Sequence, residues 1–229
     1  MSTADDVRRR ARADMRQAIV DAARARLATE GPAQLSLRAV ARDVGMVSSA
    51  VYRYVASRDA LLTALIVEGY DALGAAAEDA EAAVDDADLR GRWHALCLGA
   101  RNWAHQHPQE WALLFGSPVP GYAAPQDTVD PAARIPRRMV ALLHDAVAGG
   151  VRLPERELPA ALTASIAPVQ EFFGEELPGE AVVRGLMAWT QLTGAISHEL
   201  FGHRHGAVDP HEVFFAAEMD RMADLVGLP

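Results

Sequence analysis

The amino-acid sequence predicts an all-α protein. Apolar residues recur every three or four positions along most of the 229-residue chain, which is the spacing of a buried helix face. Serine, glycine and proline stand where these segments begin and end, as they do at helix caps. No segment of any length alternates apolar and polar residues as a half-buried strand would. We therefore expect helices joined by turns and loops.

The first part of the chain is expected to contain short helices. The apolar spacing over residues 15–27 predicts the first of them, which Gly31 ends. Ser36 is a good N-cap for a second helix, which Gly45 closes after about two turns. A third short helix is expected from about residue 48 to residue 54.

The rest of the chain is expected to form longer helices. Ser57 caps a helix that continues past Ile66. The segment from Gly116 to Pro131 is too rich in proline and glycine for a helix, so a loop is expected there. Pro168 should kink or split the helix that contains it. The remaining helices are expected at residues 90–106, 109–115, 134–148, 158–173, 180–201 and 210–226.

The charge of the chain is divided unevenly. Residues 1–60 hold 11 arginines and seven acidic residues, a charge of +4, whereas residues 61–229 carry −13 and the whole chain −9. A basic segment on an acidic protein suits two parts that face different partners. We therefore expect a small domain over residues 1–60 and a larger helical domain over residues 61–229.

The composition favours a cytoplasmic protein without a membrane segment. Cys97 is the single cysteine, so no intrachain disulfide can form. No apolar run approaches the ~20 residues that a bilayer requires. The N-terminus is charged and lacks the hydrophobic stretch of a secretory signal.

The short helices of the first 60 residues fit a helix-turn-helix. Ala41 stands where the two helices should cross, because only a small side chain permits close approach. Gly45 can adopt the positive φ that a tight turn needs, and Val51 is the expected inward anchor of the second helix. Hydroxyl, tyrosine and arginine side chains are then left on the outward face, where they can reach base edges and phosphates.

Basic and polar side chains around this turn are the candidate DNA contacts. They are Arg38, Arg42, Ser48, Ser49, Tyr52, Arg53, Tyr54 and Arg58. The arginines within residues 8–12 are expected to form a loose arm that could follow the DNA backbone or enter a minor groove. The alternative for any one arginine is a solvated surface residue, but the whole set with the Ala-Gly-Val spacing favours DNA binding.

The chain resembles a known family of regulators over residues 19–62, IVDAARARLATEGPAQLSLRAVARDVGMVSSAVYRYVASRDALL. This stretch is similar to the N-terminal DNA-binding domain of the TetR/AcrR family of transcriptional regulators. The resemblance implies that the third helix, Tyr52 and Arg58 touch DNA, whereas Tyr54 stands where many members carry histidine. RNWAHQHPQEWALLF (residues 101–115) and AWTQLTGAISHELFGH (residues 188–203) resemble the C-terminal module of a subgroup marked by tryptophan, histidine and glycine.

The resemblance also implies a homodimer whose last two helices pair with their copies as a four-helix bundle. Apolar stripes on the two expected helices permit this pairing, and Gly185 and Gly194 allow close approach. The stripes are formed by Val182, Leu186, Trp189, Ile196 and Leu200, and by Phe214, Phe215, Met219 and Met222. The alternative is that these stripes pack on their own subunit.

Catalytic, metal and cofactor sites are not expected. His105 and His107 lie two residues apart, so their rings would point in different directions from a helix. Cys97 lies on an apolar helix without an obvious base, so a buried structural thiol is expected. A helical enzyme with an appended DNA-binding head is nevertheless the alternative from another functional class.

Aromatic residues of the central helices predict an apolar cavity for a small hydrophobic effector. The candidate lining residues are Trp93, Trp103, Trp111, Phe115, Met139, Leu143, Phe172 and Trp189. The alternative for each of them is ordinary core packing. The sequence therefore predicts a ligand-responsive homodimeric regulator of a palindromic DNA operator, most simply a repressor, with an activator of the same family as the alternative.

Overall fold

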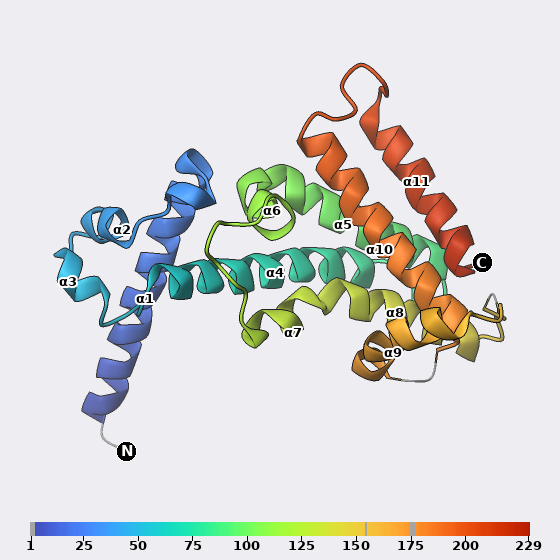
Figure 1. The fold of residues 1–229 in the computed structure, drawn as a ribbon, viewed down its shortest axis with the longest axis horizontal. Helices are drawn as coiled ribbons and strands as arrows, with labels where there is room; N and C mark the ends of the chain where they lie inside the picture. The colour runs from blue at the N-terminus through green and yellow to red at the C-terminus, as the bar shows by residue number, and fades with distance from the viewer. Residues whose placement is uncertain (1–2, 154, 175–176) are drawn as a thin grey trace. The chain divides into compact units, whose positions relative to one another are not determined.

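The computed structural model describes residues 3–153, 155–174 and 177–229 (Figure 1). Every regular element within these ranges is a helix, so the predicted all-α class is confirmed. The α-helices are α1 (Thr3–Glu30), α2 (Leu37–Asp43), α3 (Ser48–Val51), α4 (Arg58–Ala82), α5 (Leu89–Gln106), α6 (Pro108–Phe115), α7 (Val129–Ala132), α8 (Arg134–Ala148), α9 (Ala160–Phe173), α10 (Gly179–Leu200) and α11 (His211–Val226). Two short 3-10 helices are η1 (Pro32–Gln34) and η2 (Gln126–Thr128).

The chain divides into two compact units. The first contains Met1–Asp71 and His107–Ala132, and the second contains Ala72–Gln106 and Ala133–Pro229. The long helix α4 begins in the first unit and ends in the second. The domain boundary predicted at residue 60 stays a prediction, since this division groups residues by their contacts in space.

The first unit is built around one hydrophobic core. Its fully buried side chains come from α1, α2, α3 and the first half of α4, and include Leu27, Val40, Ala41, Val51 and Leu62. Gly45 adopts a φ of 70° after α2. The backbone amide of Met46 then donates a hydrogen bond of 2.8 Å to the carbonyl oxygen of Ala41, which closes the turn before α3. The turn has the geometry that the sequence predicts for a helix-turn-helix.

Helix α1 begins at Thr3, which corrects the expectation of a loose N-terminal arm. Residues 8–12 have no apolar face to pack, so they carry no periodic signal, but alanine and arginine are strong helix formers. The two aspartates of the first turn also suit the positive end of the helix. The arginines of this segment therefore lie on exposed helical turns.

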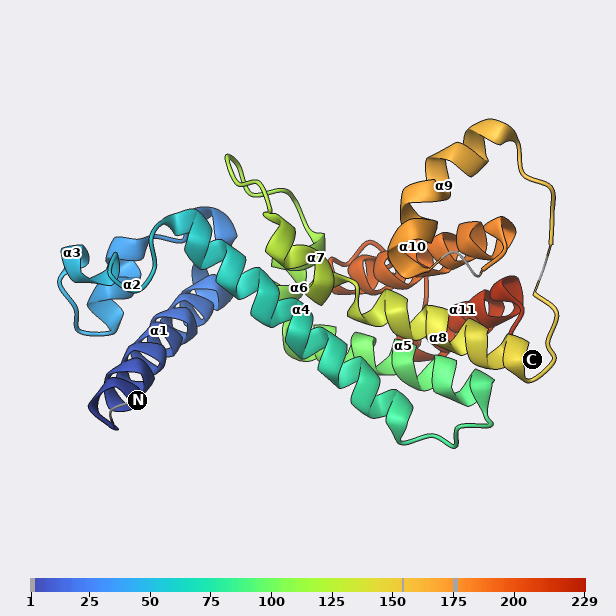
Figure 2. The same ribbon diagram turned by 90° about the horizontal axis from the view of Figure 1, so that it is seen from below.

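The second unit packs around α5, which contacts α8, α10 and α11. Its large buried side chains include Trp93, Leu96, Leu142, Leu192 and Ile196. The indole nitrogen of Trp93 donates a hydrogen bond of 2.8 Å to the carbonyl oxygen of Met219 on α11. Helices α10 and α11 lie side by side (Figure 1), and α9 packs on α10 (Figure 2).

The apolar stripes expected to form a dimer interface are partly buried within their own chain. Ile196 and Met219 are 0% exposed and Phe215 is 3% exposed, so these three side chains belong to the core of the second unit. Both helices pack on α5, and these three side chains are buried in the second unit. Leu186 and Phe214 of the predicted stripes are exposed, and the other exposed large apolar side chains of α10, α11 and the loop between them are Met187, Phe201 and Val213.

Helices α4 and α5 approach one another closely in the second unit. A methyl group added at Gly99 of α5 would come within 2.7 Å of the carbonyl oxygen of Ala76 and 2.8 Å of the Cβ atom of Ala80. Such distances are below van der Waals contact. Glycine is therefore required at this position for the two helices to pack as they do.

Ion pairs join α8 to the same half of α4. Arg134 donates hydrogen bonds of 3.0 and 2.6 Å to the carboxylate of Glu78. Arg138 donates two hydrogen bonds of 2.7 Å to Glu81, which also accepts one of 2.8 Å from Arg92. Because Glu81 is only 2% exposed, its charge is compensated within the fold.

Helix α4 is long and apolar enough to cross a membrane by length and composition alone, unlike the expectation from the sequence. Core helices satisfy the same criterion. Leu61, Leu62, Leu65 and Leu73 of α4 are buried. Three of its glutamates, Glu68, Glu78 and Glu81, form ion pairs with arginines. These contacts are those of a helix that packs inside a protein.

Candidate DNA-binding surface and ligand pocket

Helix α3 carries the candidate DNA-reading residues. It is shorter than expected, because residues 52–54 form the turn that follows it. The exposed side chains of this stretch are Ser49, Tyr52 and Arg53, whereas Ser48 and Tyr54 are half-buried. Tyr54 packs against the hydrophobic core of the first unit. On α3 and the turn that follows it, Ser49, Tyr52 and Arg53 are therefore the predicted contacts that are accessible to a partner.

Two further arginines flank α3 on the preceding helix. Arg38 and Arg42 are both exposed, and their spacing of four residues places them on one face of α2. Arg26 of α1 donates hydrogen bonds to the carboxylate of Asp43, and these bonds lower the pKa of Asp43. This carboxylate is therefore paired with a residue of α1. The guanidinium groups of Arg38 and Arg42 are suited to contacts with phosphates.

Arg58 has a more enclosed environment than the other predicted DNA contacts. Its Nε atom donates to the carbonyl oxygen of Leu35 over 3.0 Å, and its Nη2 atom donates to the carbonyl oxygen of Pro32 over 3.1 Å. Arg58 thus attaches the start of α4 to η1. Its predicted contact with DNA stays a prediction.

Arg12 is a residue whose role the sequence does not reveal. Its guanidinium donates a hydrogen bond of 2.8 Å to the carbonyl oxygen of Arg53, directly after α3. The two residues are 41 positions apart, so no local pattern pairs them. The structure thereby connects the N-terminal turns of α1 to the segment that carries Tyr52 and Arg53.

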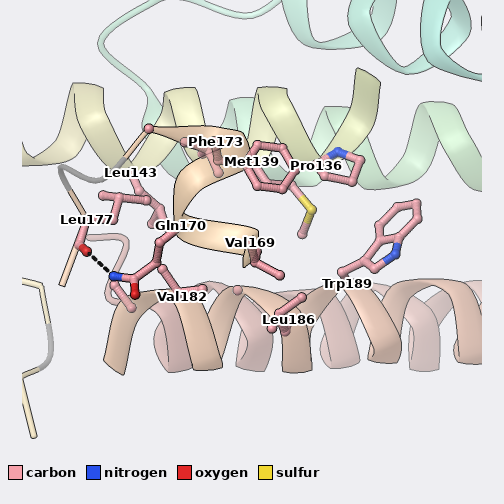
Figure 3. Close-up of a pocket in the computed structure, with 14 residues that line it drawn as sticks. Pro136, Met139, Leu143, Val169, Gln170, Phe173, Leu177, Val182, Leu186 and Trp189 are labelled. Atoms are coloured by element: carbon pink, nitrogen blue, oxygen red, sulfur yellow. Dashed lines mark hydrogen bonds between the residues drawn. The ribbon is translucent and has the colours of Figure 1, made fainter. Parts of the chain in front are cut away.

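An apolar pocket lies in the second unit, where α9 ends between α8 and α10 (Figure 3). Its volume is about 210 Å³. Helix α8 contributes Pro136, Met139, Val140 and Leu143, and α9 contributes Val169, Gln170 and Phe173. Helix α10 and the preceding connection contribute Gly174, Leu177, Ala181, Val182, Gly185, Leu186 and Trp189.

The pocket has very little polar surface. Among the described residues that line it, none carries a charge. The side-chain amide of Gln170 donates from its Nε2 atom to the carbonyl oxygen of Leu177 over 3.3 Å, as Figure 3 shows. Such a site suits a small neutral molecule better than an ion, because a buried ion without a partner has a large desolvation penalty.

Three of the eight predicted effector-binding residues line this pocket. They are Met139, Leu143 and Trp189. Trp93 and Trp103 are instead buried in packing elsewhere in the second unit, and Trp111 and Phe115 belong to the first unit, where their rings lie 4.3 Å apart. Aromatic character alone did not distinguish a pocket wall from core packing.

Phe172 is also outside the pocket. Its ring is 41% exposed, and the guanidinium of Arg137 lies 5.1 Å from its centroid. The next residue, Phe173, lines the pocket in its place. Successive helical residues point about 100° apart, so the choice between them depends on how α9 packs.

Features of metal or nucleophilic chemistry are weak. No group of three or more potential metal ligands gathers among residues 3–153, 155–174 and 177–229. Cys97 is fully buried, and burial raises the pKa of its thiol. A thiol in this setting is protonated and inaccessible, so it is a poor nucleophile.

Comparison with known sequences identifies the family. Residues 19–65 match the profile of bacterial regulatory proteins of the tetR family, and residues 93–222 match that of the tetracycline repressor-like C-terminal domain. The chain belongs to the TetR family. As a TetR-family transcriptional regulator it binds DNA through its helix-turn-helix. The closer likeness to the tryptophan-histidine-glycine subgroup stays an expectation.

Similar proteins support this assignment. The HTH-type transcriptional regulator Rv1816 of Mycobacterium tuberculosis is 41% identical over 221 residues, which cover 91% of each chain. The crystal structure of SCO4313, a proposed regulatory protein, matches with a TM-score of 0.75, 32% identity and coverage of 94% and 98% of the two chains. A Rhodococcus sp. RHA1 protein of unknown function matches with a TM-score of 0.69 and 26% identity, with 93% and 94% covered. The named relatives of this TetR-family chain are regulators and not enzymes.

Proposed function

We propose that this TetR-family regulator is a cytoplasmic homodimeric repressor that leaves a palindromic operator when a small hydrophobic effector binds. The predicted DNA contacts are Arg38, Arg42, Ser48, Ser49, Tyr52, Arg53, Tyr54 and Arg58. The predicted effector site is the apolar pocket that includes Met139, Leu143 and Trp189. An activator would need the same two sites, so the direction of regulation is a matter for experiment.

The observation that carries the proposal is the position of α8. One side of this helix lines the pocket through Met139 and Leu143. Arginines of the same helix, Arg134 and Arg138, form ion pairs with Glu78 and Glu81 of α4. A ligand that displaces α8 would therefore act on α4, whose other half belongs to the unit with the helix-turn-helix.

Release follows from linkage between the two sites. A ligand shifts a conformational equilibrium only if it binds one state more tightly than the other. In a dimer on DNA, two recognition helices must enter successive major grooves about 34–36 Å apart. An effector that favours a different position of α4 would change this separation and weaken operator binding.

Exposed apolar side chains of α10 and α11 support a homodimer. Met187, Val213 and Phe214 are 53%, 65% and 41% exposed in the single chain. They belong to two helices that lie side by side and whose inner faces already pack on the second unit. Exposed apolar groups on adjacent helices are suited to an isologous contact with a second copy.

The proposal is tested by selection of DNA fragments from the source genome with purified protein, followed by titration with small apolar compounds. We expect enrichment of a palindrome and release by a subset of the compounds. Transcripts of the adjacent genes should rise when the regulator is deleted, whereas a fall would identify an activator. Retention of no fragment above random DNA by the parent protein would overturn the proposed operator. The Arg38→Ala, Arg42→Ala double variant serves as the control with weakened DNA binding.

A further inference from the structure

We infer that a second copy of this chain closes the apolar pocket, so that the dimer contact and the ligand site share one surface of α10. The inference rests on the proposed function, because it takes the pocket as the effector site and the protein as a homodimer. It goes further in one respect: the pocket of a single chain lacks part of a wall, which the partner subunit supplies. The ligand should then bind the dimer in preference to the monomer.

Leu186 lies on the border between the pocket and the solvent. It lines the pocket together with Val182 and Trp189 of the same helix (Figure 3), yet its side chain is 39% exposed. The wall that α8 forms is different, because Met139 and Leu143 are 5% and 3% exposed. A ligand in the pocket of a single chain would therefore be covered by α8 and open to water beside Leu186.

The exposed side of α10 that begins at Leu186 carries no charge. Residues 185–197 contain no acidic residue, arginine, lysine or histidine, although a helix that faces water usually presents charged side chains. Leu186, Thr190 and Gly194 follow at intervals of four residues, so they lie on one face, which we call the α10 stripe. Leu186 and Thr190 are exposed, and Gly194 is half-buried. The stripe is therefore accessible in the single chain.

Gly194 leaves room on this stripe for another helix. A Cβ atom added there would meet no atom of a neighbouring element within 4 Å, so packing within the chain does not require a glycine. Glycine also lowers the stability of a helix relative to alanine. A position without a side chain on an uncharged, accessible face suits the close approach of a helix from another chain.

The charge of the protein favours a second copy as the occupant. Residues 61–229 carry a net charge of −13, so acidic faces of this part repel the same faces of another copy. In an isologous contact each patch meets itself, and a patch without charge avoids this repulsion. The exposed side chains of Val213 and Phe214 add apolar area on α11, which packs beside α10.

Thiol labelling tests whether a partner covers Leu186. Leu186→Cys and Phe172→Cys form a matched pair, because the two native side chains are 39% and 41% exposed and Phe172 lies outside the pocket. The native Cys97 is fully buried and should not react. Where sedimentation shows a dimer, we expect N-ethylmaleimide to modify Leu186→Cys about tenfold more slowly than Phe172→Cys, since a covered thiol is protected. In a monomer the two rates should be similar.

Ligand binding tests whether the partner completes the pocket. Thr190→Asp places a carboxylate on the α10 stripe but outside the pocket lining, so it should give a folded monomer. The neutral apolar probe is 1-octanol, and its binding is measured by calorimetry. We expect it to bind the parent dimer about tenfold more tightly than this monomer, because covering a further ~60 Å² of ligand surface has that effect at ~25 cal/mol per Å². By reciprocity, saturating 1-octanol should lower the dissociation constant of the dimer by about tenfold or more.

Val147→Asp is the matched control for the added charge. It places the same carboxylate at an apolar position of α8 that is 47% exposed and outside the pocket lining. This variant should remain a dimer and bind 1-octanol as the parent does.

Equal labelling of Leu186→Cys and Phe172→Cys in the parent dimer would overturn the inference, as would equal affinity of 1-octanol for the dimer and the monomer. A parent that is monomeric or does not bind 1-octanol, or a Thr190→Asp protein that stays dimeric, would contradict it too. The proposed function fails separately. If 1-octanol prefers the dimer but no apolar compound releases the operator, the shared surface stands and the effector role does not. If an effector releases the operator yet binds the monomer equally well, the effector role stands and the shared surface does not.

Discussion

Arg138 of α8 holds Glu81 of α4 through two hydrogen bonds of 2.7 Å, and the two residues are 57 positions apart in the chain. Residues 136–143 of α8 therefore contain both a wall of the apolar pocket and an attachment to α4, which begins in the unit with the helix-turn-helix. Under the proposed function, this pair connects a helix of the pocket to α4.

Breaking the pair should uncouple ligand binding from DNA release. We expect Arg138→Met to leave the affinity for the effector nearly unchanged while it lowers the ratio of operator affinities without and with effector. Allosteric coupling is typically 1–3 kcal/mol, so the loss should be about fivefold or more in that ratio. The measurement is operator binding at zero and saturating effector. Arg137→Met is the control, since Arg137 lies over the exposed ring of Phe172.

Shortening a pocket side chain should change the effector response alone. Met139→Ala is expected to raise the effector concentration for half-release by about tenfold or more, because a buried methionine contributes roughly 1.5–3 kcal/mol of apolar contact. Operator affinity without effector should stay close to that of the parent. Phe172→Ala should give a release curve like the parent's, and a shifted curve for this variant would contradict the boundaries of the pocket.

The arginines near α3 should separate into two kinds. Arg42→Ala is expected to weaken binding to all sequences and to lower the slope of log affinity against log salt by about one. Arg53→Ala should relax the preference at one operator position by roughly 1–3 kcal/mol. Arg58→Ala should also destabilise the free protein by about 1–2 kcal/mol, because it removes hydrogen bonds to Leu35 and Pro32. An unchanged melting temperature for Arg58→Ala would argue against that structural role.

Charges on α10 and α11 should distinguish the dimer face from the core. Val213→Asp places a carboxylate at an exposed apolar position, so we expect a folded chain that sediments as a monomer. Ile196→Asp places it at a fully buried position, and we expect loss of folding. A Val213→Asp protein that sediments as a dimer would place the interface on another face.

Acid should weaken the contact between α4 and α8. Burial raises the pKa of Glu81, but hydrogen bonds from Arg138 and Arg92 outweigh it, so the pKa lies below its ordinary value of about 4.5. A carboxylate with a lowered pKa in the folded state stabilises the protein above that ordinary value, and the contribution is lost as the pH falls below it. Glu81→Gln should cost about 3 kcal/mol at neutral pH and flatten the acid side of the stability curve, as measured by urea unfolding.

Local features were predictable from the sequence, and long-range ones were not. Ala41, Gly45 and Val51 are close in the chain, and their sizes and backbone preferences define the turn directly. The choice between Phe172 and Phe173 as a pocket residue depends instead on the rotation of α9, which packing on α10 decides. The N-terminal turns of α1 went unrecognised because an exposed helix has no apolar stripe to mark it.

Helix α4 packs closely against α5 at Gly99. A Cβ atom at Gly99 would lie 2.7 Å from the carbonyl oxygen of Ala76 and 2.8 Å from the Cβ atom of Ala80, so the two helices leave no space for a side chain between them at this point. Arg58 begins helix α4, 18 residues before Ala76. This separation corresponds to about 27 Å along the helix axis at ~1.5 Å per residue. A tilt of α4 by about 10° about its contact with Gly99 would move the Arg58 end by roughly 5 Å. An effector that tilts α4 about this contact, as the proposed release requires, would therefore produce its largest displacement at the end of α4 that joins the helix-turn-helix.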